Sequence, residues 1–233
     1  MTLPILMYHS IAVDYADELT VKTEMLERQF SYIRQKGYTP IFFRDLISSQ
    51  ESHSEPLPKK PIIITFDDGY QNNADLLFPL LEKYDMKASI ALVSKYLGKQ
   101  SEWDGCNAKA LMDATTANSA PKNRVEFTLH SYAHICYRHC SINDIEDDLK
   151  LAITAMKQAG IAYTPTLVYP YGAFPREKNA YKQFCAMLEH NGIAAGLRIG
   201  NRINRLPIKD KFHICRIDVK GTYSFCKFKI KLI

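Results

Sequence analysis

The stretch Pro61–Tyr70, PIIITFDDGY, decides the fold. Its first six residues are apolar or β-branched, which is typical of a strand buried on both faces of a parallel sheet. Two carboxylates, Asp67 and Asp68, follow at the end of this strand, and Gly69 allows a sharp turn there. Adjacent carboxylates repel each other and need a cation or a proton when they are buried. A solvated turn that caps a helix is the alternative interpretation, but the apolar run before the carboxylates favours a buried strand end.

Apolar runs and helical patterns alternate along the rest of the chain. We expect further strands at Leu3–Met7, Ala88–Val93, Val125–Leu129, Thr166–Tyr169 and His213–Val219, and helices at Glu24–Lys36, Asp75–Tyr84, Ser141–Gln158 and Lys178–Asn191. This order predicts the α/β class with a parallel sheet. Residues 48–60 are interpreted as a surface loop rather than a linker, so we expect a single domain over residues 1–233.

Polar or turn-forming residues follow four of the expected strands. They are His9, the Asp67–Gly69 turn, His130 and the Pro170–Gly172 turn. In α/β folds the chemistry lies at the carboxyl ends of the parallel strands. Four such ends can meet at one mouth, which favours a barrel-shaped enzyme over an open sheet.

His130 and His134 have the spacing of many metal ligands. Four residues apart, they are expected on one side of a helical turn. Together with an aspartate they would form an open site with two histidines and one carboxylate, which suits a hydrolytic Zn²⁺ or a non-haem iron. The second carboxylate at positions 67–68 favours hydrolysis, since it can accept a proton from a water molecule.

Three motifs in this order make the sequence similar to a known family. They are Thr65–Gly69 (TFDDG), His130–His134 (HSYAH) and Tyr169–Gly172 (YPYG). The chain resembles the polysaccharide deacetylases of carbohydrate esterase family 4, the group with the NodB homology domain. Its opening, LMYHSI at Leu6–Ile11, is similar to the poly-N-acetylglucosamine deacetylase branch. The resemblance covers nearly the whole chain and implies a distorted (β/α)7-type barrel.

The resemblance also implies a role for each matching residue. Asp67 would be the general base, and Tyr171 would offer its backbone N–H to the oxyanion. His9 would be the general acid. The metal ligands would be Asp68, His130 and His134. The implied cofactor is Zn²⁺ or another divalent transition metal, and the implied reaction removes an N-acetyl group from an N-acetylated amino sugar.

Two positions depart from the family pattern. The third motif often carries an arginine that braces the catalytic aspartate, but Val168 occupies that place and Arg216 is the candidate substitute. The family's late Leu-x-His motif is not evident, so His213 is the second candidate for the general acid after His9.

Two other functions remain open from the sequence. His130, His134, Cys136 and Cys140 can be interpreted as a structural zinc site, although their spacing fits known zinc fingers poorly. The unusual Val168 and the absent late motif favour a second alternative, a glycan-binding domain that has lost catalysis. The retained pair of aspartates argues against that alternative.

Composition limits the partners. The net charge of +5 is mild, and no basic stripe with interleaved aromatic residues predicts nucleic-acid binding. The expected partner is an N-acetylhexosamine glycan, lipid-linked precursors included, with at most peripheral membrane contact. The alternating tail Lys227–Ile233 is expected to be an edge strand. The start lacks a basic leader, which predicts a cytoplasmic protein with six reduced cysteines.

Overall fold

The computed structural model describes residues 1–50 and 56–232. The strands are β1 (Thr2–Leu3), β2 (Ile5–Tyr8), β3 (Ser10–Ala12), β4 (Thr20–Lys22), β5 (Thr39–Pro40), β6 (Pro61–Phe66), β7 (Ala88–Leu92), β8 (Val125–Leu129), β9 (Thr166–Val168), β10 (Ala195–Ile199), β11 (Asn204–Arg205) and β12 (Ile214–Asp218). The helices are α1 (Thr23–Gln35), α2 (Phe43–Ser48), α3 (Phe78–Lys83), α4 (Ala114–Asn118), α5 (Ile142–Gln158), α6 (Lys178–His190) and α7 (Phe225–Lys231).

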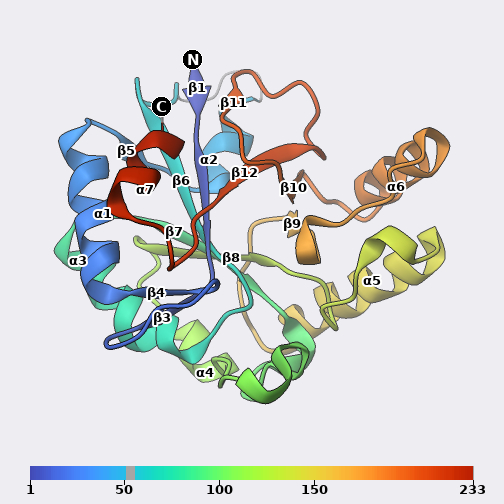
Figure 1. The fold of residues 1–233 in the computed structure, drawn as a ribbon. Coiled ribbons are helices and arrows are strands. Elements are labelled where there is room, and N and C mark those ends of the chain that lie inside the picture. Colours follow the sequence, from blue (N-terminus) through green and yellow to red (C-terminus); the bar gives the residue numbers. More distant parts are fainter. Residues whose placement is uncertain (51–55, 233) are drawn as a thin grey trace.

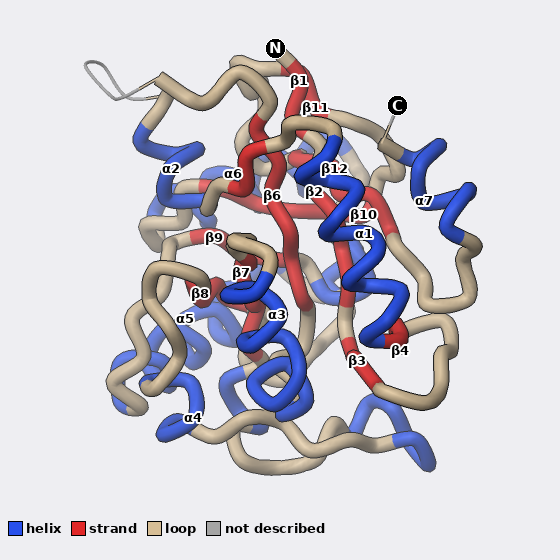
Figure 2. Tube along the Cα trace, turned by 90° about the vertical axis from the view of Figure 1, so that its left-hand side faces the viewer, coloured by secondary structure: helices blue, strands red, loops and turns tan. Residues whose placement is uncertain are grey.

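Seven parallel strands close into a barrel in the order β2, β12, β10, β9, β8, β7 and β6. Pairing of β2 with β6 completes the circle, with Ile5 opposite Ile63. The joint between β8 and β9 is the narrowest, because a single pair, Leu129 and Leu167, defines its register. The predicted (β/α)7-type barrel is therefore confirmed. Figure 1 shows the helices outside the strands, and Figure 2 shows the same arrangement from the side.

Alternation of side chains along the strands sorts the interior into two layers. Ile62 and Ile64 of β6 belong to the large apolar cluster, which includes residues of the outer helices. Ile63 belongs to a second cluster, made of residues from other strands and from α2. Because side chains of a strand point to opposite faces in turn, Thr65 and Asp67 follow Ile63 on the face that lines the barrel. The same rule carries the inward face of β8 to His130.

One expected helix and one missed strand need correction. The helix expected at Asp75–Tyr84 begins as a π-helical turn, Asn73–Leu77, and becomes α3 afterwards. Pro79 lies at the start of α3 and has no N–H to donate to the preceding turn, which explains the change. The seventh barrel strand, β10, was not expected, because Gly196 interrupts its short apolar run. A Cβ at Gly196 would lie 1.9 Å from the hydroxyl of Tyr169, so the strand needs glycine there.

The tail is helical and not an edge strand. Ser224 caps α7, its side chain accepting a hydrogen bond from the backbone N–H of Lys227. Phe225, Phe228 and Leu232 pack against the main core, and their spacing of three and four residues is that of one helix face. Alternation of lysines with apolar residues over so short a stretch fits a strand and a helix equally well.

Other expectations meet different outcomes. Residues 51–55 of the expected surface loop lie outside the described part of the chain, and α2 extends to Ser48 at its start. None of the six cysteines is in a disulfide in the structure, and their reduced state stays a prediction. Across the described residues, no helix is both long enough and apolar enough to cross a bilayer.

A buried carboxylate organises the barrel end opposite to the site described below. Glu126 of β8 accepts hydrogen bonds from the backbone N–H of Phe43 and from the hydroxyls of Ser89 and Thr164, over 2.5 to 2.6 Å. Burial raises the pKa of Glu126, although these donors oppose the rise. The carboxylate joins β7 and β8 to the start of α2.

Substitution Glu126→Gln tests this arrangement through the pH dependence of stability. A carboxyl with a raised pKa binds its proton more tightly in the folded state. The wild type therefore loses unfolding free energy as the pH rises above the unfolded value near ~4.3, by about 1.4 kcal/mol for each unit of pKa shift. The variant lacks this loss. We expect the stability of the wild type relative to Glu126→Gln to fall with rising pH in urea titrations. A rise would contradict the assignment.

Candidate active site

The carboxyl ends of the barrel strands surround a pocket of about 420 Å³. Its lining includes all the residues singled out in the three motifs and at the first strand end, namely His9, Asp67, Asp68, His130, His134 and Tyr171, together with Arg216. The strand ends that sequence patterns placed at one mouth thus meet there. Trp103 and Asp104 of the 3₁₀ segment Glu102–Asn107 add a wall that the sequence did not indicate.

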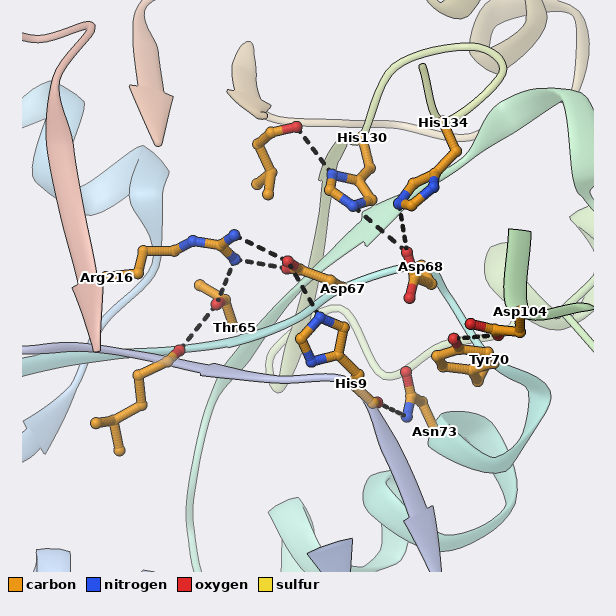
Figure 3. A network of polar contacts seen from close by, with 12 residues as sticks. His9, Thr65, Asp67, Asp68, Tyr70, Asn73, Asp104, His130, His134 and Arg216 are labelled. Carbon is orange, nitrogen blue, oxygen red and sulfur yellow. Dashed lines mark hydrogen bonds and ion pairs between the residues drawn. The ribbon is translucent and has the colours of Figure 1, made fainter. Parts of the chain in front are cut away.

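Arg216 of β12 holds Asp67, which follows β6, and the strand β2 lies between them. Its Nη1 donates to Asp67 Oδ1 over 2.6 Å and its Nη2 donates to Oδ2 over 2.8 Å (Figure 3). Nη1 also donates to Thr65 Oγ1, which donates in turn to the carbonyl of Leu6. A bidentate pair of this kind fixes both the position and the plane of the carboxylate. Arg216 therefore stands where a brace for Asp67 is needed, and Val168 plays no such part with its side chain.

The ion pair keeps Asp67 ionised despite its burial. Asp67 is only 2% exposed. Burial raises the pKa of this carboxyl, but the charges of Arg216 and His130 and the hydrogen bonds from Arg216 outweigh it and lower the pKa below its usual value. At neutral pH Asp67 is a fixed anion with the capacity to accept a proton.

Asp68 faces two imidazoles. Its Oδ1 lies 3.4 Å from Nε2 of His130 and 3.4 Å from Nε2 of His134 (Figure 3). All three side chains are buried, and Asp68 Oδ1 has no hydrogen-bond donor. A left-handed backbone at Asp68 (φ 73°) and at Gly69 (φ 76°) turns the chain so that the carboxylate enters the pocket. Gly69 also leaves space for Leu92, whose side chain would clash with a Cβ.

These three residues fit a divalent metal ion. Their ligand atoms lie within 4.8 Å of one another. The Nδ1 atom of His130 is 2.8 Å from the carbonyl of Val168, to which it donates, so the Nε2 atom presents its lone pair to the pocket. A buried carboxylate oxygen without a donor, together with the Nε2 atoms of two histidines, forms a ligand set that suits a transition metal. Val168 thus serves the site through its backbone.

The two histidines do not lie on a helical turn, contrary to the expectation from their spacing. His130 directly follows β8, and His134 lies in the loop beyond it, in which Ser131 (φ 64°) and His134 (φ 58°) adopt left-handed backbone conformations. Their imidazoles differ in electrostatics. Burial alone lowers both pKa values. The nearby Asp68 raises the pKa of His130 above its usual value, whereas burial keeps the pKa of His134 below it.

The cysteines near this loop do not join the cluster. Among the described residues, the group of His, Cys, Asp and Glu side chains close enough to share a metal contains Asp68 and the two histidines, but neither Cys136 nor Cys140. The thiol of Cys140 donates instead to the carbonyl of Cys136 over 3.2 Å. The geometry gives no support to a closed site with two histidines and two cysteines.

The two candidates for the general acid lie at opposite ends of the barrel. His9 follows β2 at the mouth, with its Nε2 3.9 Å from Asp67 Oδ2 and its carbonyl held by the side-chain amide of Asn73 over 3.0 Å. His213 precedes β12 and packs between Phe174 and Tyr181, outside the pocket. Only His9 is placed to reach a substrate in the pocket.

Aromatic rings flank His134. The indole of Trp103 stacks on the imidazole with 4.3 Å between ring centroids, and Tyr171 lies 4.8 Å away on a tilt. Tyr171 has a left-handed backbone (φ 59°) and is 57% exposed, so its ring stands at the rim. Tyr70 fixes the wall that carries Trp103, since its hydroxyl donates to Asp104 over 2.7 Å (Figure 3). Trp103 is the single tryptophan of the chain, and this was a signal in the sequence for an aromatic residue at the pocket that the motifs did not include.

Comparison with known proteins agrees with this geometry. The family model described as polysaccharide deacetylase matches residues 54–189, more than half of the chain. The chain belongs to the polysaccharide deacetylase family. Poly-beta-1,6-N-acetyl-D-glucosamine N-deacetylase of Escherichia coli K12 is 33% identical to this family member over 94 residues. That match spans 39% of the chain and only 14% of the length of the relative.

Solved structures share the fold of this deacetylase-family chain. Streptococcus pyogenes deacetylase PplD, solved with acetate, has a TM-score of 0.80 at 19% identity and covers 100% of this chain and 99% of its own. A de-N-acetylase from Aggregatibacter actinomycetemcomitans has a TM-score of 0.81 at 19% identity, with coverage of 99% and 100%. The predicted resemblance to the deacetylase family and the predicted barrel are both confirmed.

The Arg216–Asp67 pair of this deacetylase-family barrel predicts the effect of Arg216→Met. The substitution leaves a buried carboxylate without its partner, which costs about 3–5 kcal/mol of unfolding free energy at neutral pH. The wild-type Asp67 has a lowered pKa, so its contribution is present above the unfolded value near ~3.9 and is lost as the pH falls further. The deficit of Arg216→Met should therefore shrink in acid.

Urea denaturation of a matched double variant checks the cause. Asp67→Asn combined with Arg216→Met carries no uncompensated charge and should recover much of the lost stability. Equal deficits in the single and double variants, or a deficit of Arg216→Met that grows in acid, would contradict the ion-pair account.

Proposed function

We propose that this chain is a zinc-dependent hydrolase that removes N-acetyl groups from an N-acetylated amino sugar in a polysaccharide or glycan precursor. One observation carries the proposal: Asp68 Oδ1 lies 3.4 Å from the Nε2 atoms of both histidines, unpartnered and buried, beside a second carboxylate. Family membership supports the reaction type. The name of the E. coli relative supports an N-acetylglucosamine polymer as the substrate class. A lipid-linked glycan precursor is the second substrate that we propose.

The proposed metal ligands are Asp68, His130 and His134. When bound, zinc would polarise the amide carbonyl and lower the pKa of a coordinated water molecule. Two neutral imidazoles and one carboxylate leave coordination positions open on the pocket side, as hydrolytic sites require. We also propose that residues 1–233 form one catalytic unit, because the motif residues and Arg216, which lies close to the end of the chain, line one pocket.

Asp67 is the proposed general base. Arg216 keeps its carboxylate ionised and in a fixed plane, so Asp67 accepts a proton as the water oxygen forms its bond to the amide carbon. The backbone N–H of Tyr171 is proposed to donate to the carbonyl oxygen as negative charge develops on it. His9 is proposed to protonate the nitrogen while the carbon–nitrogen bond breaks. The products are acetate and the free amine of the sugar.

Two substitutions of adjacent carboxylates separate metal binding from proton transfer. We expect Asp68→Ala to lose the metal. Asp67→Asn leaves the buried Arg216 without its partner and should lower stability. The folded variant should keep about one metal ion per chain and lose roughly 10²–10⁴-fold in acetate release from N-acetylglucosamine oligomers, the usual contribution of a general base. Elemental analysis and an acetate assay on the same preparations provide both readouts.

The cysteines supply the control for that experiment. Cys136→Ser combined with Cys140→Ser should retain both the metal and the activity, whereas loss of the metal there would favour the structural zinc site. Wild-type protein that binds the oligomers and the metal but releases no acetate would support the glycan-binding alternative. Full activity in Asp67→Asn would overturn the proposed mechanism.

His9→Asn and His213→Asn form a matched pair for the general acid. Because only His9 borders the pocket, we expect His9→Asn to lower kcat by roughly 10²-fold or more and His213→Asn to leave kcat unchanged. The loss should be smaller on an activated acetyl ester, whose leaving group needs no proton. Equal activity of both variants on the amide would remove His9 from the mechanism.

A further inference from the structure

The segment that separates the two histidines has an uncommon backbone. Both Ser131 and His134 adopt positive φ angles, 64° and 58°. Left-handed conformations of residues other than glycine are costly and persist only when their surroundings hold them. Because the direction of the His134 side chain follows from its backbone, whatever holds this loop also sets the distance between His134 Nε2 and Asp68 Oδ1.

A buried carboxylate from α5 enters this loop. Asp148 Oδ2 accepts from the backbone N–H of Tyr132 over 2.9 Å, and Asp148 Oδ1 accepts from the backbone N–H of Ala133 over 3.1 Å. Two successive N–H groups that converge on one carboxylate form a small anion-binding concavity. The pair of hydrogen bonds therefore fixes the middle of the loop from outside the barrel.

Tyr137 adds a third donor to the same carboxylate. Its hydroxyl donates to Asp148 Oδ2 over 2.9 Å, and its side chain is fully buried. Burial, followed by the nearby charge of Asp148, raises the pKa of Tyr137, so the hydroxyl keeps its proton and remains a donor. Asp148 thus connects both sides of His134 in the chain, at residues 132–133 and at residue 137.

Asp148 is a charged residue on the apolar face of α5, so its burial needs an explanation. Asp148 is 6% exposed and lies between Ile145 and Leu149 on the buried face of α5, where apolar side chains are expected. Burial of a carboxylate is costly unless donors satisfy it. Asp148 satisfies three donors of the loop between β8 and α5 and touches none of the three proposed ligands.

We infer that Asp148 is a positioning residue for the metal site. Its carboxylate holds residues 131–134 in the left-handed conformation that directs His134 toward Asp68, and so sets metal affinity without contacting the metal or the substrate. This inference rests on the proposed function, because it presumes that Asp68 and the two histidines bind zinc.

Asp148→Asn tests the inference with little change in volume. The amide keeps one acceptor oxygen, but its NH₂ group cannot accept from a backbone N–H, so one end of the loop loses its anchor. We expect the affinity for Zn²⁺ to fall roughly 10- to 100-fold, the usual effect of removing a partner outside the ligand shell. Competition with a chromophoric chelator measures the affinity. The visible absorption of the Co²⁺-loaded protein reports a changed ligand geometry.

Glu126→Gln is the matched control. Glu126 is likewise a buried carboxylate of three or more donors, but it lies at the opposite end of the barrel. Both variants are expected to lower the melting temperature of the metal-free protein. Only Asp148→Asn should alter metal affinity and the Co²⁺ spectrum, which a merely structural role would leave unchanged.

Tyr137→Phe keeps the test decisive if Asp148→Asn does not fold. It removes one donor to the carboxylate and leaves both backbone contacts, so we expect a smaller loss of affinity, roughly two- to tenfold. If Asp148→Asn folds and its affinity for Zn²⁺ is unchanged, the inference is overturned. If Asp148→Asn does not fold, an unchanged Zn²⁺ affinity of Tyr137→Phe overturns it. In either case, zinc binding by the wild type still upholds the proposed metal site. Wild-type protein that binds no zinc overturns the proposed function itself, and the inference with it.

Discussion

The ion pair between Arg216 and Asp67 is the interaction on which the rest of this molecule depends. Arg216 is completely buried, and Asp67 is nearly so. Either charge alone would be too costly in this interior, but the bidentate geometry compensates both. The pair joins β12 to β6 across β2, the strand that lies between them in the barrel. A polar lumen is therefore compatible with a closed and apolar outer layer.

This pairing also divides the work of the two adjacent carboxylates. Asp67 has its charge neutralised by Arg216, whereas Asp68 has an oxygen that no donor satisfies. Two carboxylates joined by one peptide bond thus acquire different environments, one matched to a proton and the other to a cation. The difference arises from the left-handed turn at Asp68, which aims the two side chains apart.

Sequence patterns predicted much of the fold and most of the residues of the candidate site. Long periodic segments such as α5, and the β-branched run of β6, were predictable because their apolar residues repeat with one period over many positions. The turn at Asp67–Gly69 was predictable too, because two carboxylates and a glycine follow the apolar run. Short elements were not predictable: β10 contains a glycine that serves a tyrosine elsewhere in the chain, and α7 has too few residues to separate two periods.

The remaining site residues depend on distant packing. The placement of Arg216 against Asp67 and of Trp103 against His134 joins positions far apart in the chain, which no local pattern encodes. The spacing of His130 and His134 indicated that both bind one metal ion, but it suggested the wrong local structure. A spacing of four fits a helical turn, but here Asp148 on α5 and backbone contacts hold the intervening residues as a loop.

At the narrow joint between β8 and β9, the hydrogen bond from His130 to Val168 has two roles. Backbone register there rests on Leu129 and Leu167, and the next contact along the joint is the hydrogen bond from His130 Nδ1 to the carbonyl of Val168. The side chain of His130 thus connects β8 to β9 beyond the point where their backbone pairing ends. The orientation of the imidazole is consequently coupled to the closure of the barrel, because a rotation of that ring would break a hydrogen bond between β8 and β9.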